Sequence, residues 1–345
     1  MIANRAPAGE PESLSKLMNS NTIVIATRGS PLALAQSRNV LAQCQAHFPE
    51  LQFDLRIIKT TGDELQSVSM AKEGVDLPKG LFTKELEVAL LDKSADLAVH
   101  SLKDLPTTLP PGLVLGGVGR REDVRDVLIY RDNAAGHPAS LRGFPPLAKI
   151  ENFPSGAVIA TSSTRRKAQL LARNPGLKTP DIRGNVATRL RKVAEQAEMD
   201  ATILALAGMT RLGFKISPEG QLSGPEVPNG LRATILDTDT MLPCVGQGAI
   251  GLEIRESDDR LAKICARLSD VATQQCVTAE RAFLEAMGGG CQSPVAAYGE
   301  LNGSKLRLRV RSFLHGPMRQ AQAEDAATEA ITLGKRLATE VKSAA

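Results

Sequence analysis

One stretch of the sequence carries residues whose types and order could perform chemistry. In "LAVHSLKDLP", an apolar run typical of a strand ends on His100, Lys103 and Asp104, and Pro106 stops further regular structure. A carboxylate such as Asp104 facing an arginine-rich cleft stays ionised, so it could stabilise a cation, hold a pyrrole-like N–H group or carry a proton. The structural alternative is that Asp104 pairs with Lys103 or caps the turn.

A second stretch, "AMGGGCQSP", places Cys291 directly after three glycines. The five cysteines are scattered and form no C-x-x-C pair, so neither a disulfide framework nor a metal site is predicted. Glycines allow a mobile or sharply turned loop, which could present a thiol to a cleft. Without a Cys-His-Asn set, an attachment point suits Cys291 better than a protease nucleophile. A buried structural thiol is the alternative, and we expect that role for Cys44, Cys265 and Cys276.

Two strand-to-helix turns and a set of arginines predict an anion-binding cleft. In "ATRGSPLALAQ" and "ATSSTRRKAQ", a strand runs through a polar turn into a helix, whose first N–H groups lack helical partners and favour anions. Guanidinium groups match carboxylates and phosphates with paired hydrogen bonds. A serine cap and a solvated basic face are the structural alternatives. The candidate residues are Arg28, Ser30, Arg120, Arg121, Ser163, Arg165, Arg166, Arg183, Arg189 and Arg211.

The composition argues against several classes of protein. The 345 residues carry 42 Lys+Arg against 38 Asp+Glu, a net charge of +4, and only 3% are aromatic, with no Trp. So mild a charge and so few aromatics disfavour nucleic acid as a partner. No apolar run approaches the ~20 residues that span a bilayer, and the N-terminal stretch lacks the apolar core of a secretory signal. We expect a cytoplasmic protein without a membrane partner, preceded by a disordered polar leader over residues 1–20.

The elements that must position these residues alternate along the chain. Strands alternate with helices of ten or more residues, which predicts an α/β fold with mixed or parallel sheets. A strand over residues 22–26 precedes a helix that begins at Pro31, and the pattern restarts near residue 124. The Pro- and Gly-rich residues 217–243 break the pattern and predict a loop. Beyond them we expect a smaller block, with a helix near 276–287, an antiparallel sheet and a terminal helix.

Taken together, these segments resemble the porphobilinogen deaminase (hydroxymethylbilane synthase) family. They occur in the family's order from about residue 22 to residue 300, and they include "IATRGSPLALAQ", "KGLFTKELE", "AVHSLKDLPT", "SSTRRKAQL", "LPCVGQGAIGLEIR" and "AERAFLEAMGGGCQSPV". The resemblance implies a transferase that joins four porphobilinogen molecules head to tail with loss of ammonia, giving hydroxymethylbilane. It also implies a dipyrromethane cofactor, bound covalently to Cys291 through a thioether.

The resemblance also implies roles for individual residues. Asp104 takes the place of the family's catalytic aspartate, and loss of ammonia would leave a cationic azafulvene for it to stabilise. Cys291 would keep the growing polypyrrole chain tethered, which makes repeated couplings local. Ser30, Lys103, Arg121, Ser163, Arg165, Arg166, Arg183 and Arg189 would bind the cofactor, and Arg28, Arg166 and Arg211 would bind the substrate. No metal is expected.

The fold that the resemblance implies has three domains in a monomer. The first two resemble type II periplasmic binding proteins with mixed sheets, and the third is a small α/β domain with an antiparallel sheet. We expect them over residues 21–120 with 247–267, residues 121–246, and residues 268–345. The sequence departs from the family pattern at Leu77-Pro78, where glycines are usual, and in the segment 217–240, which is longer than usual.

A non-catalytic cytosolic anion-binding sensor with a periplasmic-binding-protein-like fold is the competing hypothesis. It would explain the two turns and the arginines. It leaves Asp104 and Cys291 without a role, so the sequence favours the transferase.

Overall fold

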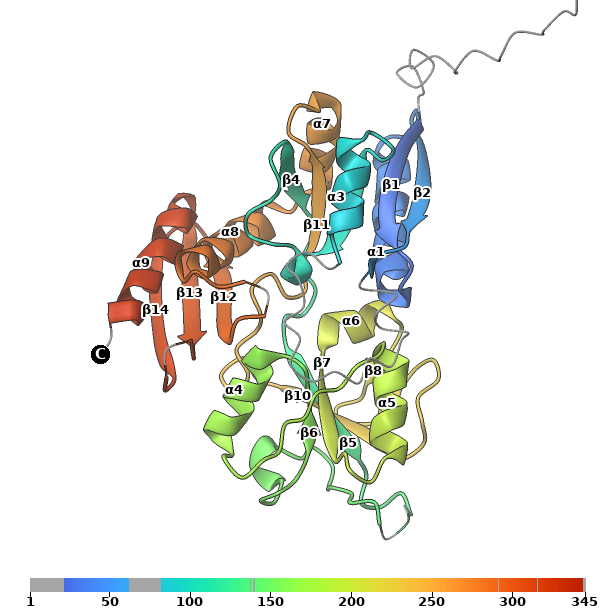
Figure 1. The fold of residues 1–345 in the computed structure, drawn as a ribbon, viewed down its shortest axis with the longest axis vertical. Coiled ribbons are helices and arrows are strands. Elements are labelled where there is room, and N and C mark those ends of the chain that lie inside the picture. Colours follow the sequence, from blue (N-terminus) through green and yellow to red (C-terminus); the bar gives the residue numbers. More distant parts are fainter. Residues whose placement is uncertain are drawn as a thin grey trace, which may run out of the picture.

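The computed structural model describes residues 22–61, 82–136, 138, 140–290, 292–314 and 316–343. They form two mixed sheets and one antiparallel sheet with flanking helices, which confirms the predicted α/β class (Figure 1). The leader over residues 1–20, Leu77-Pro78 and Cys291 lie outside the described residues. Within the described ranges, no helix is long and apolar enough to cross a membrane, and no group of three or more His, Cys, Asp and Glu could hold a metal ion.

The first sheet has the strand order β2-β1-β3-β11-β4. Its strands are β1 (Thr22–Arg28), β2 (Gln52–Ile58), β3 (Leu97–Ser101), β4 (Leu113–Val118) and β11 (Ile250–Arg255). β1, β2 and β3 are parallel, whereas β11 runs antiparallel to both of its neighbours. Helices α1 (Pro31–His47) and α7 (Asp259–Leu268) bury one face of the sheet, and α3 (Lys84–Leu91) buries the other. The 3-10 helix η2 (Leu102–Asp104) continues directly from β3.

The second sheet has the order β10-β5-β7-β6. Its strands are β5 (Asp126–Arg131), β6 (Ile159–Ala160), β7 (Ala201–Ala205) and β10 (Leu231–Leu236), and its helices are α4 (Thr164–Arg173), α5 (Val186–Glu195), α6 (Leu206–Arg211) and η3 (Ile150–Asn152). The prediction of a loop over residues 217–243 is wrong in its central part. β10 pairs with the whole of β5, because Leu231 and Ala233 are buried against it. A short hairpin, β8 (Lys215–Ile216) and β9 (Leu222–Ser223), precedes β10.

The chain passes between the two sheets twice. Each sheet takes an antiparallel strand that follows one of these crossings: β5 follows residues 119–125, and β11 follows residues 237–249. The crossings are bonded to one another, with the Glu122 N–H donating to the Gly248 carbonyl at 3.1 Å and Gln247 Nε2 donating to the Val124 carbonyl at 2.7 Å. These hydrogen bonds join the two crossings between the first and the second sheet. The exact domain boundaries stay a prediction.

The third sheet is antiparallel, in the order β12-β13-β14, as the sequence predicts. It comprises β12 (Val295–Asn302), β13 (Lys305–Ser312) and β14 (Arg319–Ala326), with helices α8 (Val271–Ala286), η4 (Ala327–Glu329) and α9 (Ala330–Ser343). Alternate residues of β13 are buried under α8 and α9, which is the pattern of a sheet with one covered face. Gly334 lets the two helices approach closely, because a Cβ atom there would lie 2.4 Å from the Ala279 carbonyl.

Candidate active site

A cavity of about 560 Å³ lies between the first and second sheets. Its walls come from the β1–α1 turn, η2, the N-terminal parts of α4 and α5, α6 and the second crossing. α6 lies against the start of α1 (Figure 1). A Cβ atom added at Gly208 of α6 would lie 3.5 Å from Leu32 Cδ2 of α1, at van der Waals distance. Seven of the predicted site residues line this cavity: Arg28, Ser30, Lys103, Asp104, Arg166, Arg189 and Arg211.

The first wall is built on the end of β1 and the start of α1. Ser30 caps α1, since its hydroxyl accepts a hydrogen bond from the Ala33 N–H at 3.3 Å, and Pro31 occupies the first turn. The guanidinium of Arg28 lies over the Phe82 ring, 4.2 Å from its centroid. The anion-binding turn predicted from "ATRGSPLALAQ" therefore faces the cavity.

Asp104 and Lys103 reach the same cavity because η2 is anchored on its apolar side. Leu102 is buried, and its N–H donates to the Ala249 carbonyl at 3.0 Å. Next to it, Ser101 bonds to Gln36 of α1 at 2.9 Å. Because Leu102 is held in the core, Lys103 and Asp104 lie on the cavity side of η2. The carboxylate of Asp104 is exposed at the cavity wall.

The second wall holds a buried aspartate between two arginines. Asp126 is completely buried and pairs with Arg165 at 2.8 Å and with Arg166 at 2.7 Å. Burial alone would raise the pKa of Asp126, but the two guanidinium groups lower it to about 2. Arg166 also donates to the Ile203 carbonyl, and Arg165 to the Leu242 carbonyl. The two arginines are thereby held rigidly by protein partners, and Arg166 alone of the two lines the cavity.

Two other arginines bring positive charge to the cavity without an ion pair in the part of the chain that the structure describes. Arg189 donates to the Gly184 carbonyl at 2.9 Å and Arg211 to the Gly248 carbonyl at 2.6 Å, and neither forms an ion pair within the described ranges. Burial, and next the charge of Arg166, lower the pKa of Arg189 to about 10. Burial likewise lowers the pKa of Arg211, against the influence of Glu122. Several guanidinium groups lining one cavity favour an anionic ligand.

The remaining predicted arginines and serine lie outside the cavity lining. Arg121 forms a bidentate pair with buried Glu280, at 2.6 and 3.0 Å. Burial alone would lower the pKa of Arg121, but Glu280 raises it. Ser163 caps α4 by accepting a hydrogen bond from the Arg166 N–H at 3.4 Å, and Arg183 is exposed. The cofactor-binding roles of these residues, and that of Arg165, stay predictions.

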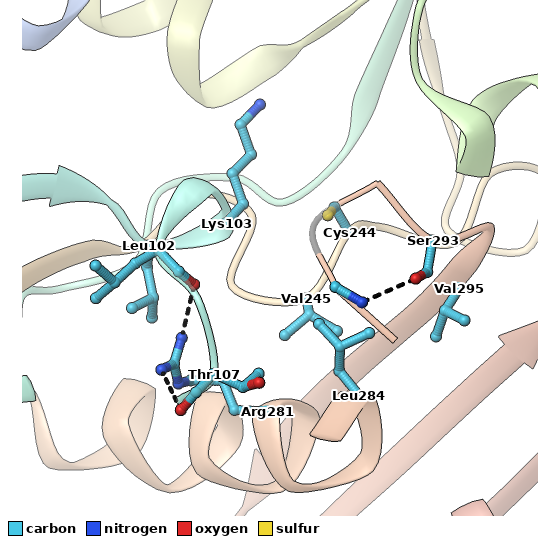
Figure 2. A pocket seen from close by; sticks show the side chains of 11 residues that line it. Leu102, Lys103, Thr107, Cys244, Val245, Arg281, Leu284, Ser293 and Val295 are labelled. Atoms are coloured by element: carbon cyan, nitrogen blue, oxygen red, sulfur yellow. Dashed lines mark hydrogen bonds between the residues drawn. The ribbon is translucent and has the colours of Figure 1, made fainter. Parts of the chain in front are cut away.

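The loop that contains Cys291 meets the first sheet at a second, smaller pocket (Figure 2). Cys291 itself lies outside the described residues, but its neighbours do not. Gly290 lines this pocket together with Lys103, Cys244 and Ser293, and the Gly290 N–H donates to Ser293 Oγ at 2.8 Å. The Gln292 carbonyl accepts a hydrogen bond from the Thr164 hydroxyl at the start of α4. The loop thus lines a pocket together with η2 and is hydrogen-bonded to the start of α4.

The triple glycine forms a tight turn. Gly288 has a φ of 72°, which favours glycine. A Cβ atom at Gly289 would lie 2.9 Å from Ser293 Oγ, closer than side chains approach. These glycines therefore allow α8 to end abruptly, which fits the sharply turned form of the predicted loop.

The other cysteines differ in exposure. Cys44, Cys265 and Cys276 are buried, and burial raises their pKa values to about 11, 12 and 11. This confirms them as buried thiols. Cys244 is partly exposed in the smaller pocket, and burial also raises its pKa.

Several residues of the site were missed by reasoning from the sequence. Asp126 ends the acid-rich "REDVRD" stretch and begins a strand, but reasoning from the sequence gave it no role. Phe82 and Gln36 line the cavity within motifs already noted, but nothing in their local pattern set them apart. Glu226 lines it from the segment whose role the sequence left open.

The comparisons with known proteins agree with the sequence resemblance. The family model "Porphobilinogen deaminase, dipyromethane cofactor binding domain" matches residues 23–263, and "Porphobilinogen deaminase, C-terminal domain" matches residues 274–343. The porphobilinogen deaminase of Syntrophus aciditrophicus is 43% identical over 318 residues, which cover 91% of this chain and 93% of that protein. That of Gloeobacter violaceus is 41% identical over 329 residues, covering 94% of this chain and 92% of its own.

A third relative and one solved structure complete the comparisons. The porphobilinogen deaminase of Bacillus velezensis is 43% identical over 281 residues, covering 81% of this chain and 80% of that protein. The effector binding domain of a BenM variant overlaps with a TM-score of 0.38 at 14% identity, covering 77% of this chain and 97% of that chain. An overlap this loose supports no inference.

Proposed function

Because the chain belongs to the porphobilinogen deaminase family, we propose that it joins four porphobilinogen molecules head to tail and releases hydroxymethylbilane. One structural observation carries the proposal. A single cavity combines an exposed aspartate, Asp104, with two arginines, Arg189 and Arg211, that form no ion pair within the described ranges. This arrangement suits a substrate that brings two carboxylates and passes through a cation. We further propose that the protein acts as a monomer in the cytoplasm.

The residues present fit the dipyrromethane cofactor for which the matched domain is named. A dipyrromethane with acetate and propionate side chains needs several cationic partners, and Arg189 and Arg211 lack carboxylate partners within the described part of the chain. Lys103 and Arg166 line the same cavity. We propose that these groups hold the carboxylates, with Cys291 as the covalent anchor. When bound, the cofactor supplies the free pyrrole α-carbon that attacks the first substrate.

Asp104 has two tasks in the proposed reaction. The C–N bond of protonated porphobilinogen breaks, its electron pair leaves with ammonia, and a cationic azafulvene remains. The carboxylate of Asp104 stabilises that cation, and no protein cation is paired with it within the described ranges. After the new C–C bond forms, the pyrrole carbon at the junction loses a proton, which the carboxylate of Asp104 at the end of η2 accepts.

The other residues of the cavity orient the substrate. Arg28, held over Phe82, and Ser30, at the start of α1, form an anion-binding turn for a substrate carboxylate. Arg211, opposite them on α6, gives a second such contact. Two fixed points on the substrate orient its aminomethyl carbon relative to Asp104.

The proposal is tested by incubating purified protein with porphobilinogen and measuring ammonia and hydroxymethylbilane together. We expect four molecules of ammonia for each hydroxymethylbilane released. Saturable binding of porphobilinogen without either product would contradict the proposal and favour the anion-binding sensor.

A further inference from the structure

The segment between β8 and β10 forms part of the cavity wall. Phe214 before the hairpin and Leu222 within it are buried in one apolar cluster, against which Val227 packs. Gly224 lies directly on Phe214, since a Cβ atom there would be 2.9 Å from the Phe214 ring. These contacts fix the turn after β9, and Pro225 and Glu226 of that turn line the cavity.

Glu226 is an unexpected residue in this lining. The cavity is lined by Arg28, Lys103, Arg166, Arg189 and Arg211, and its carboxylates are Asp104 and Glu226. Within the described ranges, Glu226 forms no ion pair and no hydrogen bond through its side chain. A carboxylate that faces the cavity repels ligand carboxylates, so it weakens binding unless the ligand also carries a cation.

The substrate of the proposed function carries such a cation. Porphobilinogen has a primary aminomethyl group, which like other alkylamines is protonated at neutral pH. Its two carboxylates satisfy the arginines, and its ammonium is left to be recognised. In the proposed reaction, Asp104 stabilises the cation that forms after ammonia has left. A second carboxylate can therefore bind the ammonium of the intact substrate while Asp104 keeps its own role.

We propose that Glu226 binds the aminomethyl ammonium of incoming porphobilinogen and thereby selects the aminated monomer. This inference rests on the proposed function and adds a specificity residue supplied by the segment that departs from the family pattern. A charge-assisted hydrogen bond between the ammonium and the Glu226 carboxylate raises affinity for the monomer. The contact persists until the C–N bond breaks, so it stabilises the bound substrate and the transition state of that step alike, and its loss raises KM without changing kcat.

The test compares Glu226→Gln with Glu219→Gln, which removes the same charge from an exposed residue of the same hairpin. Glu219 accepts a hydrogen bond from Ser217 and does not line the cavity. We expect Glu226→Gln to raise the KM for porphobilinogen about fivefold with kcat nearly unchanged, as fits one partly exposed charged contact. Glu219→Gln should leave both constants at the wild-type values.

A second probe separates recognition from structure. In an analogue of porphobilinogen, a neutral hydroxymethyl group replaces the aminomethyl group. The KM for this analogue should not rise in Glu226→Gln, because the analogue has no ammonium to lose a partner and the variant lacks the charge that repels its carboxylates. An equal rise of KM for both compounds, or no rise for either, would overturn the proposal.

The proposed function fails in a different way. If the wild-type protein forms no hydroxymethylbilane from porphobilinogen, the proposed function is wrong. If the wild type is active and carries its covalent cofactor but Glu226→Gln raises the KM for both compounds equally or for neither, only the role of Glu226 is wrong.

Discussion

The two strand-to-helix turns are alike in sequence and differ in the surroundings of their arginines. In both, a serine caps the helix: Ser30 at α1 and Ser163 at α4. In the first turn, Arg28 lies over Phe82 at the cavity wall. In the second, Arg165 and Arg166 are only 3% and 6% exposed and share the carboxylate of Asp126.

The difference shows how one local motif serves two purposes. The first turn places a guanidinium at the cavity wall, where we propose that it binds a ligand carboxylate. The second builds a rigid cationic wall, because a buried charge needs a buried counter-charge. Changes at the second turn should therefore affect folding first, and changes on the first sheet's side of the cavity should affect the reaction first.

The largest effect is expected for Asp126→Asn. This change leaves two buried guanidinium groups without their anion, which should lower the free energy of unfolding by about 3–5 kcal/mol. Chemical denaturation measures it. Asp123→Asn is the control, since Asp123 is partly exposed and pairs only with Arg125, so its loss should cost less than about 1 kcal/mol. Equal losses in the two variants would show that the Asp126 pair does not support the fold.

The ion pairs of Asp126 with Arg165 and Arg166 should also make the free energy of unfolding depend on pH. Because the folded pKa of Asp126, about 2, lies below the unfolded value near 3.9, its stabilisation is complete above that unfolded value. It is lost as the pH falls through about 2. The gap in stability between wild type and Asp126→Asn should therefore narrow from pH 5 to pH 2.

The next effect is expected on the first sheet's side, for Asp104→Asn. The amide keeps the size of the side chain but removes the charge that stabilises the azafulvene, so kcat should fall about a hundredfold or more. The free energy of unfolding should stay within about 0.5 kcal/mol of the wild type, because the carboxylate is exposed. Near-normal hydroxymethylbilane formation by this variant would refute the catalytic assignment.

A smaller effect is expected from the charge of Arg189. Its pKa of about 10 means that the guanidinium loses its proton as the pH rises through that value. Affinity for a pyrrole dicarboxylate without an amine should then fall, which calorimetry can follow from pH 8 to pH 11. In Arg189→Gln, affinity should be lower than in the wild type below about pH 10 and should lack this step. A step of the same size in the variant would place the titrating group elsewhere.

Local sequence pattern predicted the elements better than their partners. β1, the start of α1 and the antiparallel third sheet follow from periodicity and caps. β10 was missed because prolines and glycines precede it, and its strand forms only by pairing with β5, about a hundred residues earlier in the chain.

The candidate site shows the same limit. The strand end at Asp104 and the two polar turns were recognisable, because each is a local pattern that exposes polar groups. The pairing of Asp126 with Arg166 joins residues 40 positions apart, and that of Arg121 with Glu280 joins residues 159 apart. Local pattern carries no information on such distant pairs, so it could not separate arginines bound to protein carboxylates from those left for a ligand.

The covalent anchor is tested most directly by the intact mass of the freshly purified, active protein. We predict the chain mass plus two porphobilinogens less two ammonias. The increment should be absent in Cys291→Ser and present in Cys244→Ser, which removes the partly exposed thiol of the neighbouring pocket. An unmodified mass in active wild-type protein, or the same increment in Cys291→Ser, would contradict the account.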